Sequence, residues 1–261
     1  MHQRPLHLWS DALQAVIDAN CEIFRRAFVL GETSSTQDAA VRLAAGPGEV
    51  VTTGRQTAGR GRLGRPWADT AEHGIAVTGV LTHENAERLS LTTAVAVAET
   101  AETLTGRPVG IKWPNDIVAD GRKLAGILLE QRGEACLIGV GINVHHHNWP
   151  ADLASKALSL RDLGATTDRL GVLETLLPVW DTALRQSPEH LEAAFRARSV
   201  LTGAIVQFAV PDHEITGRVL GIDPTRGLQV RDDAGVQHRL PAATTRVLAV
   251  KKASESGMVG S

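Results

Sequence analysis

Four arginines crowd a short glycine-rich segment in the first quarter of the chain. Residues 54–67 read GRQTAGRGRLGRPW and contain Arg55, Arg60, Arg62 and Arg65. Like charges this close repel one another unless anions balance them, and a guanidinium group matches the paired oxygens of phosphate and carboxylate. Glycine lets the backbone close over a ligand. The segment is therefore a candidate phosphate site, with a solvated basic surface loop as the alternative.

The glycines of this segment fit a second pattern. Gly59, Gly61 and Gly64 match G-x-G-x-x-G, a spacing that also occurs in dinucleotide-binding and kinase loops. A dinucleotide-binding fold requires a helix that begins within the motif. Here Pro66 follows within two residues of the last glycine, and the strands downstream are expected to be antiparallel. The pattern disfavours a Rossmann domain.

A second group of polar residues lies where two predicted strands meet. Residues 112–116 read KWPND, and Pro114 forces a break after the first strand. Asp120-Gly121 is a two-residue hairpin signal, and Lys123 opens the strand that follows. The hairpin returns Lys123 to the neighbourhood of Asp116, so that a cation and a carboxylate face one site. A surface lysine and a turn-capping aspartate are the simpler alternatives.

The apolar segment IGVGINV, residues 138–144, contains Gly139, Gly141 and Asn143. Glycine inside a strand indicates a bulge or a close approach to the backbone. Asn143 would hold a ligand or satisfy backbone groups. The run His145–His147 follows, but neighbouring strand residues point to opposite faces and the run lacks metal-ligand spacing. We interpret it as the start of a polar loop.

These residues require a scaffold of alternating helices and strands over residues 25–200. The segment Ser34-Ser35-Thr36-Gln37-Asp38 predicts a helix with a Ser or Thr cap, and this helix stops at Gly46. Helical periodicity recurs at 88–105, 168–186 and 188–198, and strands are expected at 49–53, 74–82, 109–113, 116–119, 123–131 and 134–144. Consecutive strands joined by tight turns pair antiparallel. We predict an α+β catalytic domain with a mixed or antiparallel sheet and flanking helices.

The ends of the chain differ from this pattern. Residues 1–24 predict a helical extension with Leu13, Val16 and Ile17 on one face, too short for a helix-turn-helix domain. Residues 201–250 predict a small SH3-like β-barrel, with strands at 204–210, 215–222, 227–231, 236–240 and 246–250. Residues 251–261 are rich in Ser and Gly, and we expect a disordered tail.

Composition limits the class of protein. The formal net charge of −2 argues against bulk electrostatic binding to nucleic acid. Cys21 and Cys136 lie in unrelated contexts, and we expect both to be reduced. The first residues lack a signal-peptide pattern, and no apolar run approaches the roughly 20 residues of a membrane span. The default expectation is a cytoplasmic protein.

Five segments together resemble one family. Ser35-Thr36-Gln37, GRQTAGRGRLGRPW, IKWPNDIV, GRKLAGILLE and IGVGINV occur in the order and spacing of biotin–protein ligases, over residues 25–250. The resemblance implies a class II synthetase-like domain, and the absence of a helix-turn-helix resembles the monofunctional ligases. The alternatives are a lipoate or octanoate protein ligase or transferase on a related fold, and a biotin-sensing DNA-binding regulator.

The resemblance also implies an activity. Such enzymes join biotin to ATP as biotinyl-5′-AMP with Mg²⁺ and release pyrophosphate. They then transfer biotin to a lysine of a biotin carboxyl carrier protein or domain of an acyl-CoA carboxylase. The lysine amine is the nucleophile, so the enzyme needs no covalent residue of its own. Nucleic acid and membrane partners are not expected, and a homodimer is compatible with the family.

The family's functional residues carry over onto matching positions of this chain. Biotin contacts are expected at Ser35, Thr36, Gln37, Gln56, Arg60, Gly61, Arg62, Trp67, Lys123 and Gly126. ATP contacts are expected at Arg60, Arg62, Arg65, Trp67, Lys112, Asn115 and Asn143. Arg62, Lys123 and Asp116 are the expected catalytic residues, with Asp116 also as the metal ligand. Family members often have Asn where this chain has Gln37, and we expect the longer amide to tune binding without abolishing it.

Overall fold

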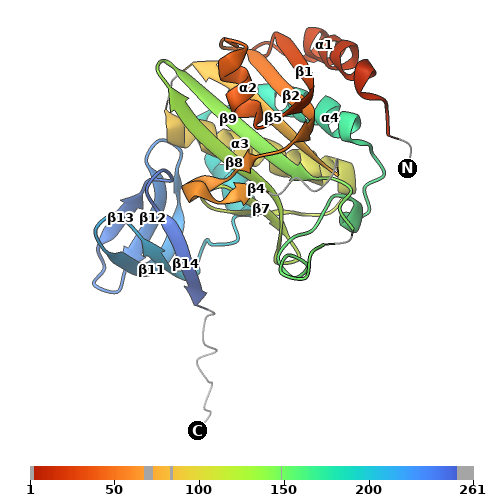
Figure 1. The fold of residues 1–261 in the computed structure, drawn as a ribbon. Coiled ribbons are helices and arrows are strands. Elements are labelled where there is room, and N and C mark those ends of the chain that lie inside the picture. Colours follow the sequence, from red (N-terminus) through yellow and green to blue (C-terminus); the bar gives the residue numbers. More distant parts are fainter. Residues whose placement is uncertain (1–2, 68–72, 83–84, 148, 252–261) are drawn as a thin grey trace.

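The computed structural model describes residues 3–67, 73–82, 85–147 and 149–251. These residues form a large seven-stranded sheet in the order β1-β2-β5-β9-β8-β7-β6 and a smaller five-stranded sheet in the order β13-β12-β11-β10-β14. Figure 1 shows the smaller sheet, in blue, as a separate lobe beside the large one. The predicted α+β class is therefore confirmed, whereas the exact domain boundaries remain predictions.

The large sheet is mixed because one edge pair is parallel. Its strands are β1 (Arg26–Thr33), β2 (Glu49–Gln56), β5 (Gly74–Thr82), β6 (Gly110–Lys112), β7 (Asp116–Ala119), β8 (Arg122–Arg132) and β9 (Ala135–Asn143). β1 pairs parallel with β2, and the other neighbours in the sheet are antiparallel. β1 is the one strand of this sheet that the sequence pattern does not predict.

The β7–β8 hairpin has the predicted turn. Asp120 and Gly121 have φ angles of 49° and 73°, so both central residues are left-handed. Two-residue turns of this kind match the twist of the strands that they join, and Gly reaches positive φ without a steric cost. The turn sets Asp116 opposite Gly126 in the register. It thereby brings the KWPND segment and the first residues of β8 together.

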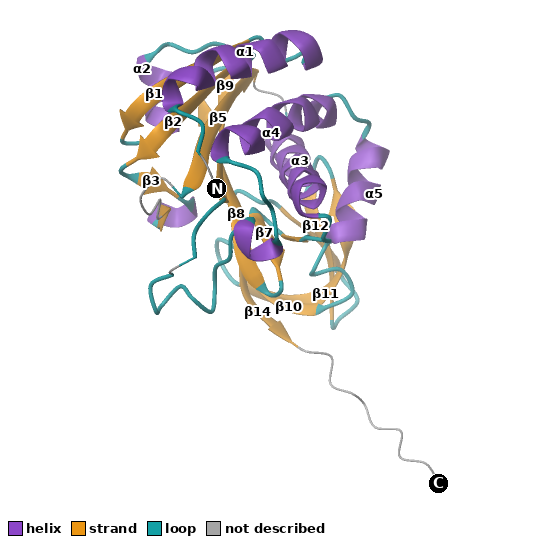
Figure 2. Cartoon of the chain, turned by 90° about the vertical axis from the view of Figure 1, so that its right-hand side faces the viewer, coloured by secondary structure: helices purple, strands orange, loops and turns teal. Residues whose placement is uncertain are grey.

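Helices cover both faces of the large sheet. They are α1 (Trp9–Asn20), α2 (Thr36–Arg42), α3 (Ala86–Thr105), α4 (Arg169–Leu184) and α5 (Pro188–Arg198). Side chains of Asn85, Asp168 and Ser187 cap the starts of α3, α4 and α5 by accepting backbone N–H groups. Figure 2 shows α1, α3 and α4 close together. Within the described parts of the chain, every helix is too short or too polar to span a bilayer.

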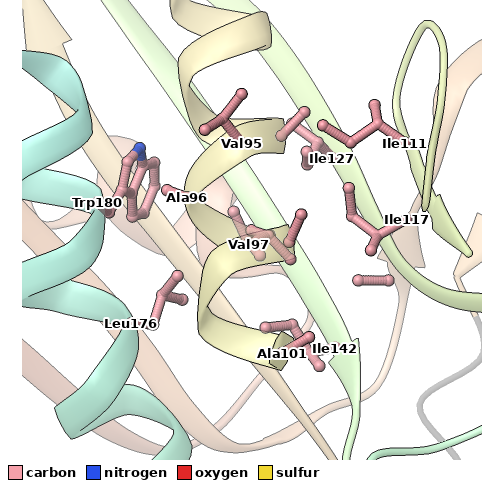
Figure 3. Close-up of a cluster of buried hydrophobic side chains, with 14 of the residues drawn as sticks. Val95, Ala96, Val97, Ala101, Ile111, Ile117, Ile127, Ile142, Leu176 and Trp180 are labelled. Atoms are coloured by element: carbon pink, nitrogen blue, oxygen red, sulfur yellow. The ribbon is translucent and has the colours of Figure 1, made fainter. Parts of the chain in front are cut away.

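The main core lies between the sheet and the α3–α4 layer. Val97 and Ala101 of α3 face Ile142 of the sheet, and Trp180 of α4 closes the cluster (Figure 3). The Trp180 indole is fully buried and donates to Thr93 Oγ1 at 3.0 Å. Burial of each large apolar side chain stabilises the fold by about 1.5–3 kcal/mol. This layer fixes the strands whose opposite face carries the site.

The opposite face of the sheet carries α2. Ala39 and Ala40 of this short helix form a separate cluster with Val51, Val80 and Leu137 of the sheet. Their small side chains let α2 approach the strands closely, which places the N-terminus of the helix directly over the sheet. That N-terminus supplies the first group of candidate site residues.

The small sheet contains all five strands predicted after residue 200. They are β10 (Ile205–Ala209), β11 (Glu214–Asp223), β12 (Gly227–Asp232), β13 (Gln237–Leu240) and β14 (Arg246–Lys251). Phe208 is fully buried and meets Trp113 of the large unit edge-on, with 6.3 Å between ring centroids. This aromatic contact joins the small sheet to the KWPND segment.

The predicted N-terminal helix is also present. Leu13 and Ile17 of α1 are fully buried and Val16 is partly buried. Cys21 and Cys136 form no disulfide, as expected. Of the predicted tail, residues 252–261 lie outside the described part of the chain.

Candidate active site

A cavity of about 320 Å³ lies on the sheet face that carries α2, between the glycine-rich segment, the KWPND segment and β14. Fourteen of the fifteen predicted site residues line it: Ser35, Thr36, Gln37, Gln56, Arg60, Gly61, Arg62, Arg65, Trp67, Lys112, Asn115, Asp116, Lys123 and Gly126. They come from segments far apart in the sequence, so the fold gathers the expected residues at one place.

One end of the cavity has a buried polar floor. The Ser35 hydroxyl accepts from Gln37 N at 3.2 Å and caps α2. Thr36 N donates to Gln56 Oε1 at 3.0 Å, and Thr78 Oγ1 donates to Thr36 Oγ1 at 2.8 Å. These side chains are all less than a tenth exposed. A fixed set of buried donors and acceptors can recognise a small uncharged polar group with little reorganisation.

Gln37 shapes the same floor. Its Nε2 donates to the backbone oxygens of Leu128 at 3.1 Å and Leu137 at 3.3 Å, which ties α2 to β8 and β9. A Cβ atom on Gly139 would lie only 3.2 Å from Gln37 Cδ. The glycine predicted to allow a close approach therefore makes room for the Gln37 amide.

The glycine-rich segment folds as a small hairpin of β3 (Gly59–Arg60) and β4 (Pro66–Trp67). Arg60 pairs with Asp38 at 2.6 Å and with Glu130 at 3.3 Å, and the hydrogen bond from Arg60 lowers the pKa of Asp38. Arg55 pairs with Glu32 at 2.9 Å and is not among the cavity residues. Acids of the protein therefore balance the charges of Arg55 and Arg60, so these two arginines need no ligand anion.

Trp67 walls the cavity against the sheet. Its ring lies so close to the backbone that a Cβ atom on Gly141 would sit 2.5 Å from Trp67 Cε2, and one on Gly126 would sit 2.9 Å from Cζ3. The Lys123 ammonium lies 5.3 Å from the ring centroid, within cation–π range. Two strand glycines are therefore required by the Trp67 ring.

The predicted meeting of cation and carboxylate is present. Lys123 Nζ lies 2.5 Å from Asp116 Oδ1, and both side chains are about one third exposed. Asn115 stabilises this corner, because its Nδ2 donates to Ile127 O at 3.1 Å and its own carbonyl accepts from Ile127 N at 2.9 Å. Lys123 and Asp116 are thus held at the cavity wall rather than free on the surface.

Arg62 connects the hairpin to the small sheet. Its Nη1 donates to Asn115 Oδ1 at 3.4 Å, and its Nη2 donates to the backbone oxygens of Ala242 and, at 3.1 Å, Thr245. Burial lowers the pKa of the Arg62 guanidinium, while the nearby Asp116 carboxylate raises it. The β13–β14 turn therefore supplies neutral acceptors to a partly buried cation.

Sequence reasoning missed the contribution of β14. Arg246, Val247 and Leu248 line the cavity from the small sheet and add another cation to its wall. The strand was predicted, but its exposed residues follow no alternation that marks a ligand-facing side. Arg246 faces the cavity because the two lobes pack together, and this packing cannot be predicted from the sequence around Arg246.

Asn143 is the predicted site residue that is not among those lining the cavity. It is buried, and its Nδ2 donates to Leu158 O at 3.0 Å and Lys123 O at 3.3 Å. Lys123 N also donates to Lys156 O at 2.7 Å. In the structure Asn143 thus supports the backbone that carries Lys123, which is the second of the two roles considered for it.

The histidine run begins a loop, as predicted, but its first two members are buried. His145 and His146 are more than nine-tenths buried, and His146 stacks on Trp149 with 4.6 Å between ring centroids. His73 meets the His146 ring edge-on at 5.6 Å. Burial, with a smaller contribution from His73, lowers the pKa of His146 to about 4. The run is part of a cluster of stacked and edge-on rings that also contains His73 and Trp149.

The donor set of the cavity suits magnesium bound mainly through a nucleotide. Among the described residues, no three His, Cys, Asp or Glu side chains are grouped as a metal site. The carboxylate of Asp116 faces the cavity beside the amide of Asn115. Magnesium usually binds one or two carboxylates together with water and phosphate oxygens. The oxygen ligands present fit that mode.

A polar floor at one end and a group of cations at the other make this the site of an enzyme for a small acid and a phosphate-bearing substrate. Residues 32–147 match the model of the biotin/lipoate A/B protein ligase family. The biotin–[acetyl-CoA-carboxylase] ligase of Mycobacterium tuberculosis is 36% identical over 77% of this chain and 81% of its own length. The bifunctional ligase/repressor BirA of Bacillus subtilis is 31% identical over 78% of this chain and 69% of its own length.

Solved structures agree. The biotin protein ligase of Aquifex aeolicus, in complex with biotin and ATP, superposes with a TM-score of 0.77 at 27% identity, over 86% of this chain and 99% of that one. This chain belongs to the biotin/lipoate A/B protein ligase family. The resemblance inferred from five sequence motifs is confirmed.

Proposed function

We propose that the protein is a biotin–[biotin carboxyl carrier protein] ligase. It activates biotin with ATP as biotinyl-5′-AMP and then transfers the biotinyl group to one lysine of a carrier protein or domain of an acyl-CoA carboxylase. The observation that carries the proposal is the single cavity lined by fourteen of the expected residues. The names of the relatives and the biotin and ATP bound to the Aquifex enzyme support it.

The polar floor is the proposed site of the biotin head. Biotin carries a neutral ureido group with two N–H donors and one carbonyl acceptor. Ser35, Thr36 and Gln56 present buried hydroxyl and amide groups whose geometry is already fixed by hydrogen bonds. A site built to pair such groups rejects acids that lack them, because its buried polar atoms would stay unsatisfied.

The cationic part of the cavity suits the first chemical step. A carboxylate oxygen of biotin attacks the α-phosphorus of ATP, the bond between the α-phosphorus and the bridging oxygen breaks, and pyrophosphate leaves. Two anions must approach each other, so cations at the reacting atoms lower the barrier. We assign Lys123 and Arg62 to the carboxylate and the α-phosphate, and Arg65, Lys112 and Arg246 to the remaining phosphates, because all five cations line the cavity. Magnesium, where bound, would add charge neutralisation here, and Asp116 is the residue that would hold it together with phosphate oxygens.

The second step needs a neutral amine. The carrier lysine attacks the acyl carbon of the adenylate, the bond to the phosphate oxygen breaks, and AMP leaves. Asp116 is the carboxylate at the cavity that can take the proton of the attacking amine. Lys123 holds this carboxylate in position, with 2.5 Å between Lys123 Nζ and Asp116 Oδ1. We assign to Trp67, which lies against the sheet beside Lys123, the shielding of the mixed anhydride from water until the carrier arrives.

Pyrophosphate release separates the candidate substrates. The purified protein is incubated with ATP, Mg²⁺ and either biotin, lipoate or octanoate. We expect release with biotin alone, and biotin transfer when a carrier domain is added. Release with lipoate or octanoate but not with biotin would refute the proposal and favour the related acyl ligases. A sequence-specific DNA complex that survives a salt series would instead favour a regulator.

A further inference from the structure

One residue of the β13–β14 turn is held by two opposite charges of the large unit. Glu87, in the first turn of α3, accepts a hydrogen bond from Ala242 N at 2.6 Å. Arg62 of the glycine-rich hairpin donates to the carbonyl oxygen of the same residue, Ala242. Both charged side chains are partly buried. An anion thus holds the N–H group and a cation holds the C=O group of one residue.

The held turn leads directly into the cavity wall. Thr245 N donates to Pro241 O at 3.2 Å, which closes the turn on itself, and Thr245 O accepts from Arg62. Arg246 follows as the first residue of β14 and lines the cavity. The position of the Arg246 backbone therefore depends on the turn that is hydrogen-bonded to Glu87.

Glu87 itself does not contact the cavity. It is not among the cavity residues, and it lies against Ala242 at a second, much smaller pocket between α3 and the small sheet. Burial raises the pKa of Glu87, while hydrogen bonds from the amides of Ala242 and Ala243 lower it. An exposed acid would be easy to place here, but a half-buried one needs its backbone partners.

We propose that Glu87 is a positioning residue for the ATP side of the first step. By fixing the β13–β14 turn it keeps Arg62 docked and Arg246 directed into the cavity, so that the small sheet becomes part of the nucleotide site. This inference rests on the proposed ligase function, since it assigns Arg62 and Arg246 to the phosphates. Glu87 is outside the five motifs that carry the family resemblance.

The test compares Glu87→Ala with Asn85→Ala. Asn85 caps α3 and donates to Thr225 O at 3.0 Å in the small sheet, so its loss also removes a helix–lobe contact, but one that does not reach Arg62. KM for ATP, KM for biotin, kcat of pyrophosphate release and Tm are measured for each variant. Glu87→Ala is expected to raise KM for ATP about tenfold and leave KM for biotin within about twofold. Asn85→Ala is expected to lower Tm without changing KM for ATP.

Two further variants distinguish positioning from general loosening. Glu87→Gln keeps an acceptor of the same length and should restore KM for ATP to within about threefold of wild type, because its amide oxygen still reaches Ala242 N. Glu87→Asp is one methylene shorter, keeps the charge, and should show the defect if Glu87→Ala does not fold. In an Arg246→Ala background, Glu87→Ala should raise KM for ATP by a smaller factor than it does in the wild-type background, because only the Arg62 contact remains to be lost.

Several results would overturn the inference. These are an unchanged KM for ATP in both Glu87→Ala and Glu87→Asp, an equal rise in KM for ATP and biotin, the same rise in Asn85→Ala, or full additivity with Arg246→Ala. The variants are assayed with whichever acid the wild type activates. Activation of lipoate but not of biotin by the wild type would therefore refute the proposed function, whereas unchanged variants of a biotin-activating enzyme would refute this inference alone.

Discussion

Gly141→Ala is a direct test of how Trp67 walls the site. The added Cβ would lie 2.5 Å from Cε2 and 2.8 Å from both Cζ2 and Nε1 of the indole. Carbon atoms in contact are about 3.5–4.0 Å apart, so the ring must retreat by roughly 1 Å. β9 is paired on both sides in the middle of the sheet, whereas Trp67 belongs to a two-residue strand at the cavity. The ring therefore moves and the sheet stays.

The cost should appear in catalysis more than in stability. A misplacement of about 1 Å near reacting groups lowers rates by up to about 100-fold. We therefore expect kcat/KM for biotin in the pyrophosphate-release assay to fall 10- to 100-fold, with Tm within a few degrees of wild type. Gly221→Ala is the matched control, because Gly221 also lies in a strand and a Cβ there would meet nothing within 4 Å.

Two results would show that the reasoning is wrong. Wild-type kcat/KM in Gly141→Ala would mean that Trp67 does not lie on this strand in the working enzyme. A large loss of Tm in Gly141→Ala but not in Gly221→Ala would mean that the sheet, not the indole, yields to the new methyl group. In that second case the substitution would not report on the position of Trp67.

Two other predictions concern charge. Lys123→Met and Arg62→Ala should each weaken the adenylation step by about 1.5–3 kcal/mol, or 10- to 150-fold in single-turnover formation of the acyl-adenylate, because each removes a charge-assisted contact; wild-type rates in the Lys123 variant would remove it from the site. The pKa of His146, lowered to about 4, makes the folded state bind fewer protons than the unfolded state below pH 6.5. The free energy of unfolding should therefore fall by about 2 kcal/mol between pH 7 and pH 5, as measured in urea. His146→Phe, which keeps a ring against Trp149, should flatten that slope, and an unchanged slope would assign the effect to other groups.

Local signals predicted most of the scaffold. Ser35 at a helix start and Asp120-Gly121 between two strands each determine a conformation within a few residues, and both appear as expected. β1 was missed because it is an edge strand whose mixed burial breaks the usual alternation of apolar and polar residues. Edge strands of this kind are recognised by their partner rather than by their own sequence.

The site was predicted through its motifs, and the errors lie where tertiary packing decides. Nothing near Arg246 in sequence indicates that its strand end meets the hairpin of the large unit. The His146 imidazole is buried partly because His73, which precedes β5, meets its ring, whereas its stacking partner Trp149 lies only three residues further along the chain. Arg60 is neutralised by Glu130, seventy residues away. Long-range partners of polar residues leave no local pattern.

The order in which the cavity walls occur along the chain has a consequence for biosynthesis. The polar floor begins at Ser35, whereas Arg246 comes from the final strand of the small sheet. A ribosome releases the floor and the hairpin long before it releases β14, and closing such distant contacts is slow relative to local folding. A partly synthesised chain can therefore contain the residues of the polar floor while it lacks the part of the cavity wall that β14 supplies. Reactive adenylate would then be made only by chains whose small lobe has emerged and docked.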